Sequence, residues 1–363
     1  MRILIDIGHP AHVHNYRNLG RNLESDGHLV FWTVKDIPIA KQLLDYYAFQ
    51  YIVFPKKSDS VFGKIWMQLV YDMMMLIYCK RKKIDLVLGT SVTIAHISRI
   101  SRVCSIVFDD DDDKVQPLVT KYVQPYADVL LSPDCLRDKR KRKDTLYYSG
   151  YHELAYLHPN RFKPDPLILT CAGLKSSESF FIMRFNVFKA HHDVGVLGLS
   201  LDQKLKLVEL LKPHGKILIT TEREIEPELR EYQLKISPEK IHSLMYYATM
   251  FLGDSQTMTS EAAVIGTPAV KCNSFAGRLS VPNELENKYQ LCYSFVPEQF
   301  DLMLTKINEL LNRPDLKMEW IIRKERMLKD KIDVTAFWSW FVENYPQSGD
   351  ILKENPKYSA RFK

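Results

Sequence analysis

The sequence lacks the features that mark several large classes of protein. Its six cysteines are scattered over 363 residues with no C-x-x-C spacing, which argues against a structural zinc site and for a reducing compartment. The most apolar stretch, residues 65–79, spans fifteen residues and includes Asp72, whereas a membrane span needs about 20 apolar residues. The amino-terminal residues have neither the charged nor the apolar region of a signal peptide. We therefore expect a cytoplasmic protein.

A strong excess of one charge is also missing. The net charge is +6, and the basic residues gather in local runs such as 80–83 and 137–143. Such runs either form solvated faces or bind an anionic membrane surface, where each basic side chain contributes about 1 kcal/mol. The apolar stretch 65–79 lies between basic residues, and it is correspondingly either a buried helix or a face that dips into a membrane. No motif for nucleic-acid binding accompanies these runs.

The sequence does contain a regular alternation of strands and helices. An apolar fraction of 46% and a charged fraction of 26% are typical of globular proteins, and the length suffices for two domains. Residues 2–7 form a β-branched run that a Gly-His-Pro sequence interrupts, and a helix and a second strand follow. This βαβ unit predicts an α/β fold with doubly wound sheets, in which loops after the strands bind ligands. The expected divisions are domains over 1–158 and 159–332, a helix over 333–346 and a polar tail over 347–363.

Residues 250–270 combine a buried strand, a hydroxyl-rich turn, a short helix and another strand. Asp254 and Ser255 are favourable N-cap residues, and a helix that starts there presents free backbone N–H groups and a positive dipole end to an anion. Gly266 supplies the C-terminal stop, and the following Thr-Pro prevents continuation. The local pattern suits a phosphate site, and it suits an ordinary capped helix equally well.

The stretch Gly253-Asp-Ser, followed by Ser260-Glu-Ala-Ala-Val-Ile-Gly-Thr-Pro-Ala-Val270, resembles the nucleotide-diphosphate turn and helix of GT-B glycosyltransferases and of the related UDP-N-acetylglucosamine 2-epimerases. More narrowly, it is similar to the DUF354 family, as is the stretch 150–159. The resemblance implies two Rossmann-like domains that face a central cleft, the first on the acceptor side and the second binding the nucleotide sugar. It also implies that the C-terminal helix crosses back to the first domain, and that no metal or other cofactor is required.

The same resemblance assigns roles to residues of the second domain. The turn would hold the diphosphate, and Glu261 would grip the ribose hydroxyls. GT-B members usually have a Gly-Gly pair in this turn, where this sequence has Ser255-Gln256. Arg184 or Lys189 would neutralise the leaving diphosphate, although an ordinary surface loop is the alternative for this segment. The expected donor-binding residues are Arg184, His192, Asp193, Asp254, Ser255, Gln256, Thr257, Met258 and Glu261.

Three histidines in the loop after the first strand are candidates for catalysis. An imidazole has a pKa close to neutrality, so it can take a proton from an attacking hydroxyl. His12 precedes His28 by sixteen positions, a spacing that resembles the loop histidine of several inverting GT-B enzymes and implies that His12 is the base. His9 and His14 would support it or contact the acceptor. The alternatives are a metal site, for which no second ligand cluster has suitable spacing, and a structural role.

Five consecutive aspartates, residues 109–113, follow another predicted strand. Their mutual repulsion requires that some of them be solvated, paired or bound to a cation. We expect Asp109 and Asp110, nearest to the strand end, to face inward and to act as a second base or an acceptor contact. A solvated loop is the alternative.

Together these features favour a glycosyltransferase that moves a sugar from a nucleotide diphosphate sugar to a hydroxyl of a saccharide or lipid-linked acceptor, in surface polysaccharide or glycolipid biosynthesis. The expected partners are the donor, the acceptor and, peripherally, the anionic inner face of the membrane. One alternative is a non-hydrolysing UDP-N-acetylglucosamine 2-epimerase, at whose motif positions this chain has Gly89-Thr-Ser91, Phe108-Asp-Asp110 and Ala190-His-His-Asp193. A non-catalytic nucleotide-sugar-binding protein is the other.

Overall fold

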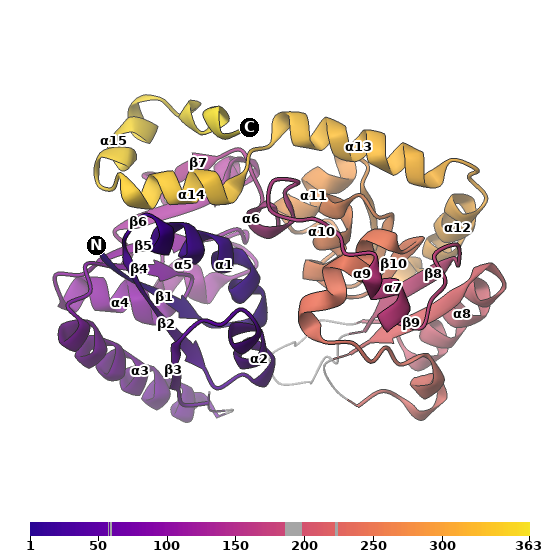
Figure 1. Cartoon of the computed structure of the whole chain (residues 1–363), viewed down its shortest axis with the longest axis horizontal. Helices are drawn as coiled ribbons and strands as arrows, with labels where there is room; N and C mark the ends of the chain where they lie inside the picture. Colours follow the sequence, from indigo (N-terminus) through magenta and orange to yellow (C-terminus); the bar gives the residue numbers. More distant parts are fainter. Residues whose placement is uncertain (57, 59, 186–197, 222–223) are drawn as a thin grey trace. The chain divides into compact units, whose positions relative to one another are not determined.

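The structure, a computed structural model, describes residues 1–363 except 57, 59, 186–197 and 222–223. It divides into two compact units (Figure 1), namely unit 1, residues Met1–Arg161 with Lys331–Lys363, and unit 2, residues Phe162–Asp330. In the described part of each unit, parallel strands form one sheet with helices packed around it. The predicted α/β fold class is confirmed.

Unit 1 contains a seven-stranded sheet in the order β3-β2-β1-β4-β5-β6-β7. Its strands are β1 (Arg2–Ile7), β2 (Leu29–Lys35), β3 (Tyr51–Phe54), β4 (Leu86–Gly89), β5 (Cys104–Phe108), β6 (Val129–Pro133) and β7 (Leu146–Tyr148). Its helices are α1 (Pro10–Ser25), α2 (Pro38–Tyr46), α3 (Val61–Lys82), α4 (Val92–Ile100), α5 (Pro117–Tyr122), α6 (Leu154–Leu157), α14 (Val334–Glu343) and α15 (Gln347–Glu354), with 3-10 turns at Asp134–Lys139 and Tyr358–Phe362.

Strand β1 lies at the point where the strand order of unit 1 reverses. It pairs in parallel with β2, with Arg2 opposite Leu29, and on its other side with β4, with Ile3 opposite Leu86. The chain builds β2 and β3 on one side of β1 and then crosses back to build β4 on the other. At such a switch point the adjacent crossover helices cover opposite faces of the sheet, and ligands bind beyond the carboxyl ends of the two strands.

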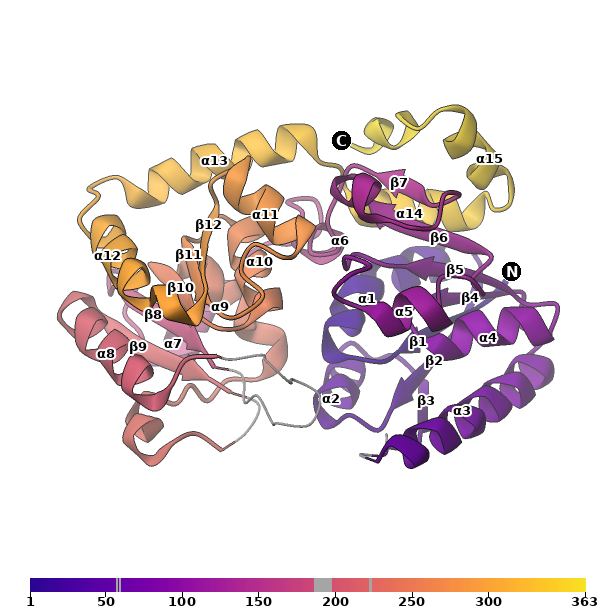
Figure 2. The same ribbon diagram turned by 180° about the vertical axis from the view of Figure 1, so that it is seen from behind.

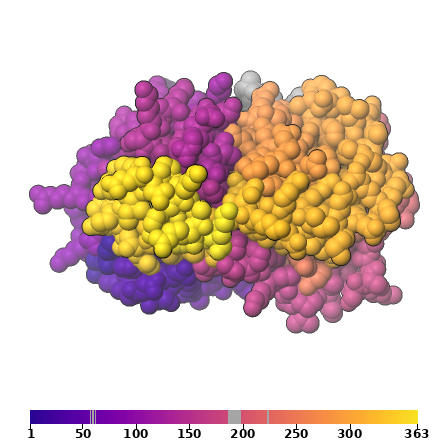
Figure 3. Space-filling view, turned by 90° about the horizontal axis from the view of Figure 1, so that it is seen from above, coloured from indigo at the N-terminus to yellow at the C-terminus, as the bar shows by residue number. Residues whose placement is uncertain are grey.

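Helix α14 packs on unit 1 although it follows unit 2 in the sequence. The buried ring of Trp338 has its centroid 4.4 Å from that of Phe108 on β5 and 5.9 Å from that of Tyr16 on α1. Asn22 Nδ2 on α1 donates to Ser339 Oγ at 2.9 Å. These contacts hold the C-terminal segment against unit 1, as Figure 3 shows from above.

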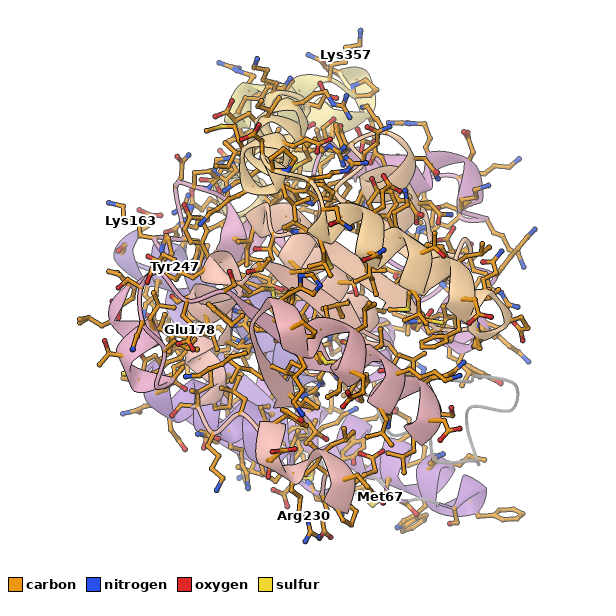
Figure 4. The ribbon with its side chains drawn as sticks, turned by 90° about the vertical axis from the view of Figure 1, so that its right-hand side faces the viewer. Met67, Lys163, Glu178, Arg230, Tyr247 and Lys357 are labelled. Atoms are coloured by element: carbon orange, nitrogen blue, oxygen red, sulfur yellow. The ribbon has the colours of Figure 1, made fainter. Side chains whose placement is uncertain are left out.

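Residues 347–363 are not the polar tail that their composition predicts. They form α15 and a final 3-10 turn, in which Leu352 is buried and the ring of Tyr358 stacks on Trp340 with 4.6 Å between centroids. The charged side chains of this segment are exposed, and Lys357 projects outward in Figure 4. The prediction was wrong because a few anchoring apolar groups suffice to fold a segment whose average composition is polar.

Unit 2 contains a five-stranded sheet in the order β12-β11-β10-β8-β9, so its strand order reverses between β8 and β10. Its strands are β8 (Phe180–Arg184), β9 (Lys216–Thr220), β10 (Met250–Gly253), β11 (Ala269–Cys272) and β12 (Cys292–Phe295). Its helices are α7 (Leu167–Cys171), α8 (Leu201–Leu211), α9 (Ile241–Tyr247), α10 (Gln256–Ile265), α11 (Ser280–Asn287), α12 (Phe300–Leu311) and α13 (Leu316–Asp330), with 3-10 turns at Lys212–His214, Pro227–Tyr232, Pro238–Lys240 and Pro297–Gln299.

A pair of glycine substitutions tests the packing of α1 against the sheet of unit 1. A Cβ on Gly20 would lie 2.3 Å from Trp32 Cζ2, whereas a Cβ on Gly349 in α15 would meet no atom within 4 Å. We expect Gly20→Ala to lower the free energy of unfolding by about 1–3 kcal/mol through overpacking. The matched change Gly349→Ala should be neutral or stabilising by up to about 1 kcal/mol, since alanine favours a helix. Urea unfolding measures both, and equal stabilities would contradict the packing.

Candidate functional site

The first candidate group lies at the carboxyl ends of β1 and β4. Pro10 begins α1, which places His12 in the first turn after the strand. The Gly8 amide donates to His12 Nδ1 at 3.3 Å, and Thr90 Oγ1, just beyond β4, lies 3.2 Å from His12 Nε2. The Thr90 hydroxyl can donate or accept a hydrogen bond, so it can pair with His12 Nε2 in either tautomer of the imidazole. The switch point of unit 1 thus holds a partly exposed, hydrogen-bonded imidazole.

The three loop histidines have different surroundings. His9 is exposed and is the N-cap of α1, where its Nδ1 accepts from the Ala11 amide at 3.2 Å. His14 is buried and stacks on Tyr156, with 5.4 Å between centroids. Residues two apart on a helix do not share a face, which separates His14 from His12. Only His9 and His12 therefore remain close to the end of β1.

In the aspartate run after β5, two residues form buried ion pairs with Arg140. Arg140 Nη1 lies 3.0 Å from Asp109 Oδ2 and 2.8 Å from Asp113 Oδ1, with its side chain 1% exposed. Gln124 Nε2 donates to both carboxylates. Burial by itself raises the pKa of Asp113, but hydrogen bonds from Gln124, Arg140 and the Lys141 amide outweigh it and lower that pKa. Asp109, predicted as a catalytic group, is thus the partner of Arg140. Of the two aspartates predicted to face inward, Asp109 is buried, whereas the Asp110 side chain is 31% exposed.

The other part of the run has the opposite electrostatics. Burial, followed by the charge of Asp109, raises the pKa of Asp110 to about 7. Asp110 Oδ2 lies 3.2 Å from Nδ1 of the buried His152, whose pKa burial lowers to about 3, so this imidazole is neutral and the contact is a hydrogen bond. Asp110 can therefore exchange a proton near neutral pH.

Three aspartates of this run also bring their carboxylate oxygens close together. One carboxylate oxygen from each of Asp109, Asp110 and Asp111 lies within 4.8 Å of the others, and this is the only such group found among the described residues. Burial, followed by the charge of Asp110, raises the pKa of Asp111 well above its ordinary value. Oxygen ligands of this kind can hold a hard divalent cation, but the Arg140 guanidinium already pairs with Asp109, so we assign no cation to this set.

The second candidate group lies at the switch point of unit 2, at the N-terminus of α10. Ser255 is the N-cap, and its Oγ accepts from the Met258 amide at 3.4 Å. Gly253 has φ +145°, and a Cβ there would lie 2.0 Å from the carbonyl oxygen of Arg184 on β8. Only glycine permits this close approach, which brings Asp254 N within 3.1 Å of the same oxygen. The predicted helix start and the stop at Gly266, with φ +91°, are confirmed.

The Gln256 side chain, at the first position of α10, is held by two residues of the next strand and loop. Lys271 Nζ donates to Gln256 Oε1 at 2.6 Å, and Asn273 Nδ2 donates to the same oxygen at 3.3 Å. Lys271 is 1% exposed, and burial lowers its pKa to about 8. Gln256 Nε2 is buried and has no hydrogen-bond partner within the described ranges. A donor group is thus positioned beside the helix N-terminus.

Two other residues predicted to contact the donor, Glu261 and Arg184, are close to side chains of unit 2. Glu261 is buried in α10, and its Oε1 lies 3.0 Å from Nε2 of the buried His242 on α9. The ribose contact assigned to Glu261 stays a prediction, and it would require this pair to rearrange. Arg184 ends β8, and its Nη1 donates to Thr220 Oγ1 at 3.3 Å. Lys189, His192 and Asp193 lie outside the described residues.

Sequence reasoning missed Arg140, His152, Thr90 and Lys271. Arg140 belongs to the basic run 137–143, which has the opposite sign to the aspartate run, and that complementarity was the available signal. His152 lies in the stretch 150–159 that resembles DUF354. Thr90 lies in Gly89-Thr-Ser91, at one of the epimerase motif positions, whereas Lys271 has no local signal because its position follows from the strand order.

Comparison with known sequences assigns a family. The model of the family described as "Protein of unknown function (DUF354)" matches residues 1–313. No curated protein sequence matches this chain.

Several solved structures share the fold. The UDP-GlcNAc 2-epimerase of Neisseria meningitidis, bound to UDP-GlcNAc, has a TM-score of 0.63 at 12% identity over 98% of this chain and 99% of that one. The UDP-GlcNAc 2-epimerase of Methanocaldococcus jannaschii, with UDP-GlcNAc and UDP, has a TM-score of 0.62 at 11% identity over 89% and 99%. A Streptomyces glycosyltransferase complexed with thymidine diphosphate has a TM-score of 0.62 at 13% identity over 94% and 99%. At these identities the likeness establishes a GT-B-like fold.

The raised pKa of Asp110 predicts a specific pH dependence of stability. Because the folded-state pKa of about 7 exceeds the ordinary value of about 4, the folded protein binds this proton more tightly, and the resulting stabilisation is lost as the pH rises from about 4 through about 7. We expect the unfolding free energy of Asp110→Asn to fall less than that of the wild type between about pH 5 and about pH 8. Urea titrations measure it, and the exposed control Asp138→Asn should keep the wild-type slope. Identical slopes for all three proteins would contradict the assignment.

Proposed function

The chain belongs to the DUF354 family, and from this premise we propose that it is a metal-independent GT-B glycosyltransferase that moves a sugar from a nucleotide diphosphate sugar to a hydroxyl acceptor. Unit 2 binds the donor, and His12 of unit 1 deprotonates the acceptor hydroxyl. The observation that carries this proposal is the N-terminus of α10, which ends the turn at the switch point of unit 2.

The proposed diphosphate contacts come from the first turn of α10. The backbone N–H groups of Gln256 and Thr257 lie in the first turn of α10, where an amide has no carbonyl partner within the helix. The Thr257 residue is exposed. The buried Gln256 Nε2 adds a donor, which Lys271 and Asn273 keep in place through Oε1. Free N–H groups and the positive dipole end favour a phosphate here. Solved structures of the same fold include complexes with UDP and thymidine diphosphate, which supports a nucleotide of this class.

In unit 1 the proposed roles belong to His12 and Asp110. The Thr90 hydroxyl orients the His12 imidazole, and His12 accepts the proton of the attacking hydroxyl. Asp110, with a pKa of about 7, is a second acid or base that contacts the acceptor, while Arg140 pairs with Asp109 beside it. We further propose a saccharide or lipid-linked acceptor, a role in surface polysaccharide or glycolipid synthesis, and a cytoplasmic location with peripheral contact at the inner face of the membrane.

A specific observation also favours the second candidate, an epimerase of the UDP-N-acetylglucosamine 2-epimerase type. Elimination and re-addition require groups that exchange protons at neutral pH, and Asp110 is such a group. Incubation with UDP-N-acetylglucosamine alone distinguishes the two reactions, because only an epimerase forms the manno product without an acceptor. Donor binding with no product under either condition would instead indicate a binding protein.

Substitution of Thr257 tests the diphosphate site. Thr257→Glu places a carboxylate where the phosphate is expected and should weaken UDP binding roughly tenfold or more through like-charge repulsion. The neutral control Thr257→Gln should bind UDP within a few-fold of the wild type. Isothermal titration measures the affinities. Equal affinities for both variants would remove the α10 N-terminus from the donor site.

Substitution of His12 tests the base. We expect His12→Ala to lower sugar transfer by roughly 10²–10⁴-fold, the usual contribution of a general base, with UDP affinity unchanged. His9→Ala removes an exposed histidine from the same loop and serves as the control, with a much smaller loss. Transfer from labelled nucleotide sugars into glycolipid and saccharide extracts provides the measurement. An unchanged rate in His12→Ala would exclude this residue as the base.

A further inference from the structure

Helix α3 has a large exposed apolar face. Six residues, each between 43% and 87% exposed, recur at helical spacing along 22 residues, and they are Phe62, Ile65, Trp66, Leu69, Met73 and Ile77. At 3.6 residues per turn they fall within an arc of about 120°. We call this set the outer face of α3. Figures 1 and 2 show α3 along the outside of unit 1.

The opposite side of the same helix is already used by the fold. Tyr71, Met75 and Cys79 are buried in a core cluster with residues of β4, α4 and β5. Asp72, the one acidic residue between 61 and 83, pairs with His96 on α4 at 2.8 Å and accepts from Gln68. This inner face of α3, formed by Tyr71, Met75 and Cys79, is therefore needed for the folding of unit 1. That need explains why these residues are apolar. The outer face contributes nothing to this core, so its apolar character calls for another contact.

Within residues 61–83, the charged side chains outside the buried side of α3 have one sign. Between Lys64 and Lys80 this face carries no charged side chain, and residues 80–83 are all basic. Lys80 continues the spacing of the outer face one turn beyond Ile77, and both Lys80 and Arg81 are exposed. A partner must therefore offer apolar material along the helix and negative charge at its C-terminal end. The interface of an anionic bilayer presents acyl chains and headgroups in this arrangement.

We propose that the outer face of α3 docks unit 1 on an anionic membrane, with the helix lying in the plane of the interface. The apolar side chains enter the acyl boundary, and Lys80 and Arg81 contact the headgroups. No helix in the described part of the chain has the length and hydropathy of a membrane span, so the contact is peripheral. This docking is independent of the reaction proposed above, because it needs neither nucleotide nor acceptor.

Vesicle flotation with the full chain and no nucleotide tests the docking. The wild type should float with phosphatidylglycerol-containing vesicles and much less with pure phosphatidylcholine vesicles. Leu69→Glu with Met73→Glu should reduce flotation at least roughly tenfold, since glutamates in this face oppose insertion. The matched control is Leu302→Glu with Met318→Glu in unit 2, where the two side chains are both 58% exposed, against 58% and 59% for Leu69 and Met73. Equal flotation of both double variants would overturn the proposal.

Two further measurements separate the membrane from other partners. Trp66 is the most exposed of the five tryptophans, so its emission should shift to shorter wavelength on anionic vesicles and be quenched by brominated lipids. Lys80→Gln with Arg81→Gln should weaken anionic-vesicle binding roughly tenfold, whereas Lys353→Gln with Lys357→Gln should not. If instead Trp66 is unaffected by vesicles, and sedimentation shows a dimer that Leu69→Glu with Met73→Glu dissociates, the face binds a second copy and the membrane assignment is wrong.

Discussion

The parallel arrangement of every paired strand is the constraint from which both candidate groups follow. In a parallel sheet all carboxyl ends lie at one edge, so residues separated by dozens of positions meet there. In unit 1 this brings His12, after β1, next to Thr90, after β4. In unit 2 it brings the turn before α10 against the end of β8. There the Arg184 backbone lies so close that position 253 has no room for a side chain. Each group therefore exists because the strand order reverses at that point.

Electrostatics then separates the roles of adjacent residues. Five consecutive carboxylates repel one another, and Arg140 offsets part of this repulsion by pairing with Asp109 and Asp113. Asp110, for which the described residues supply no such cation, adjoins the neutral His152, and its pKa is raised to about 7. A structural ion pair and a reactive carboxyl thus stand side by side in one short segment. In unit 2 the burial of Lys271 is tolerated because its ammonium donates to Gln256.

Local signals predicted much of this organisation. The cap at Ser255, the stop at Gly266 and the βαβ start of the chain depend on neighbouring residues, and the structure has each of them. The predicted tail failed because anchoring of Tyr358 on Trp340 is a tertiary contact. His14 was grouped with His12 by proximity in the chain, but helical geometry turns it toward Tyr156. For α3 the apolar composition permitted either a buried helix or a membrane face, and the structure shows that one face is buried while the other is exposed.

By itself the sequence determined the α/β class, the helix limits around the α10 turn and the family, because periodicity, caps and short motifs are encoded within a few residues of one another. Only the tertiary structure decided that Arg140 pairs with Asp109 and Asp113, that His152 contacts Asp110, and that Lys271 holds Gln256. Each of these contacts joins different elements of a sheet or its loops, and the strand order that brings them together is a property of the whole fold.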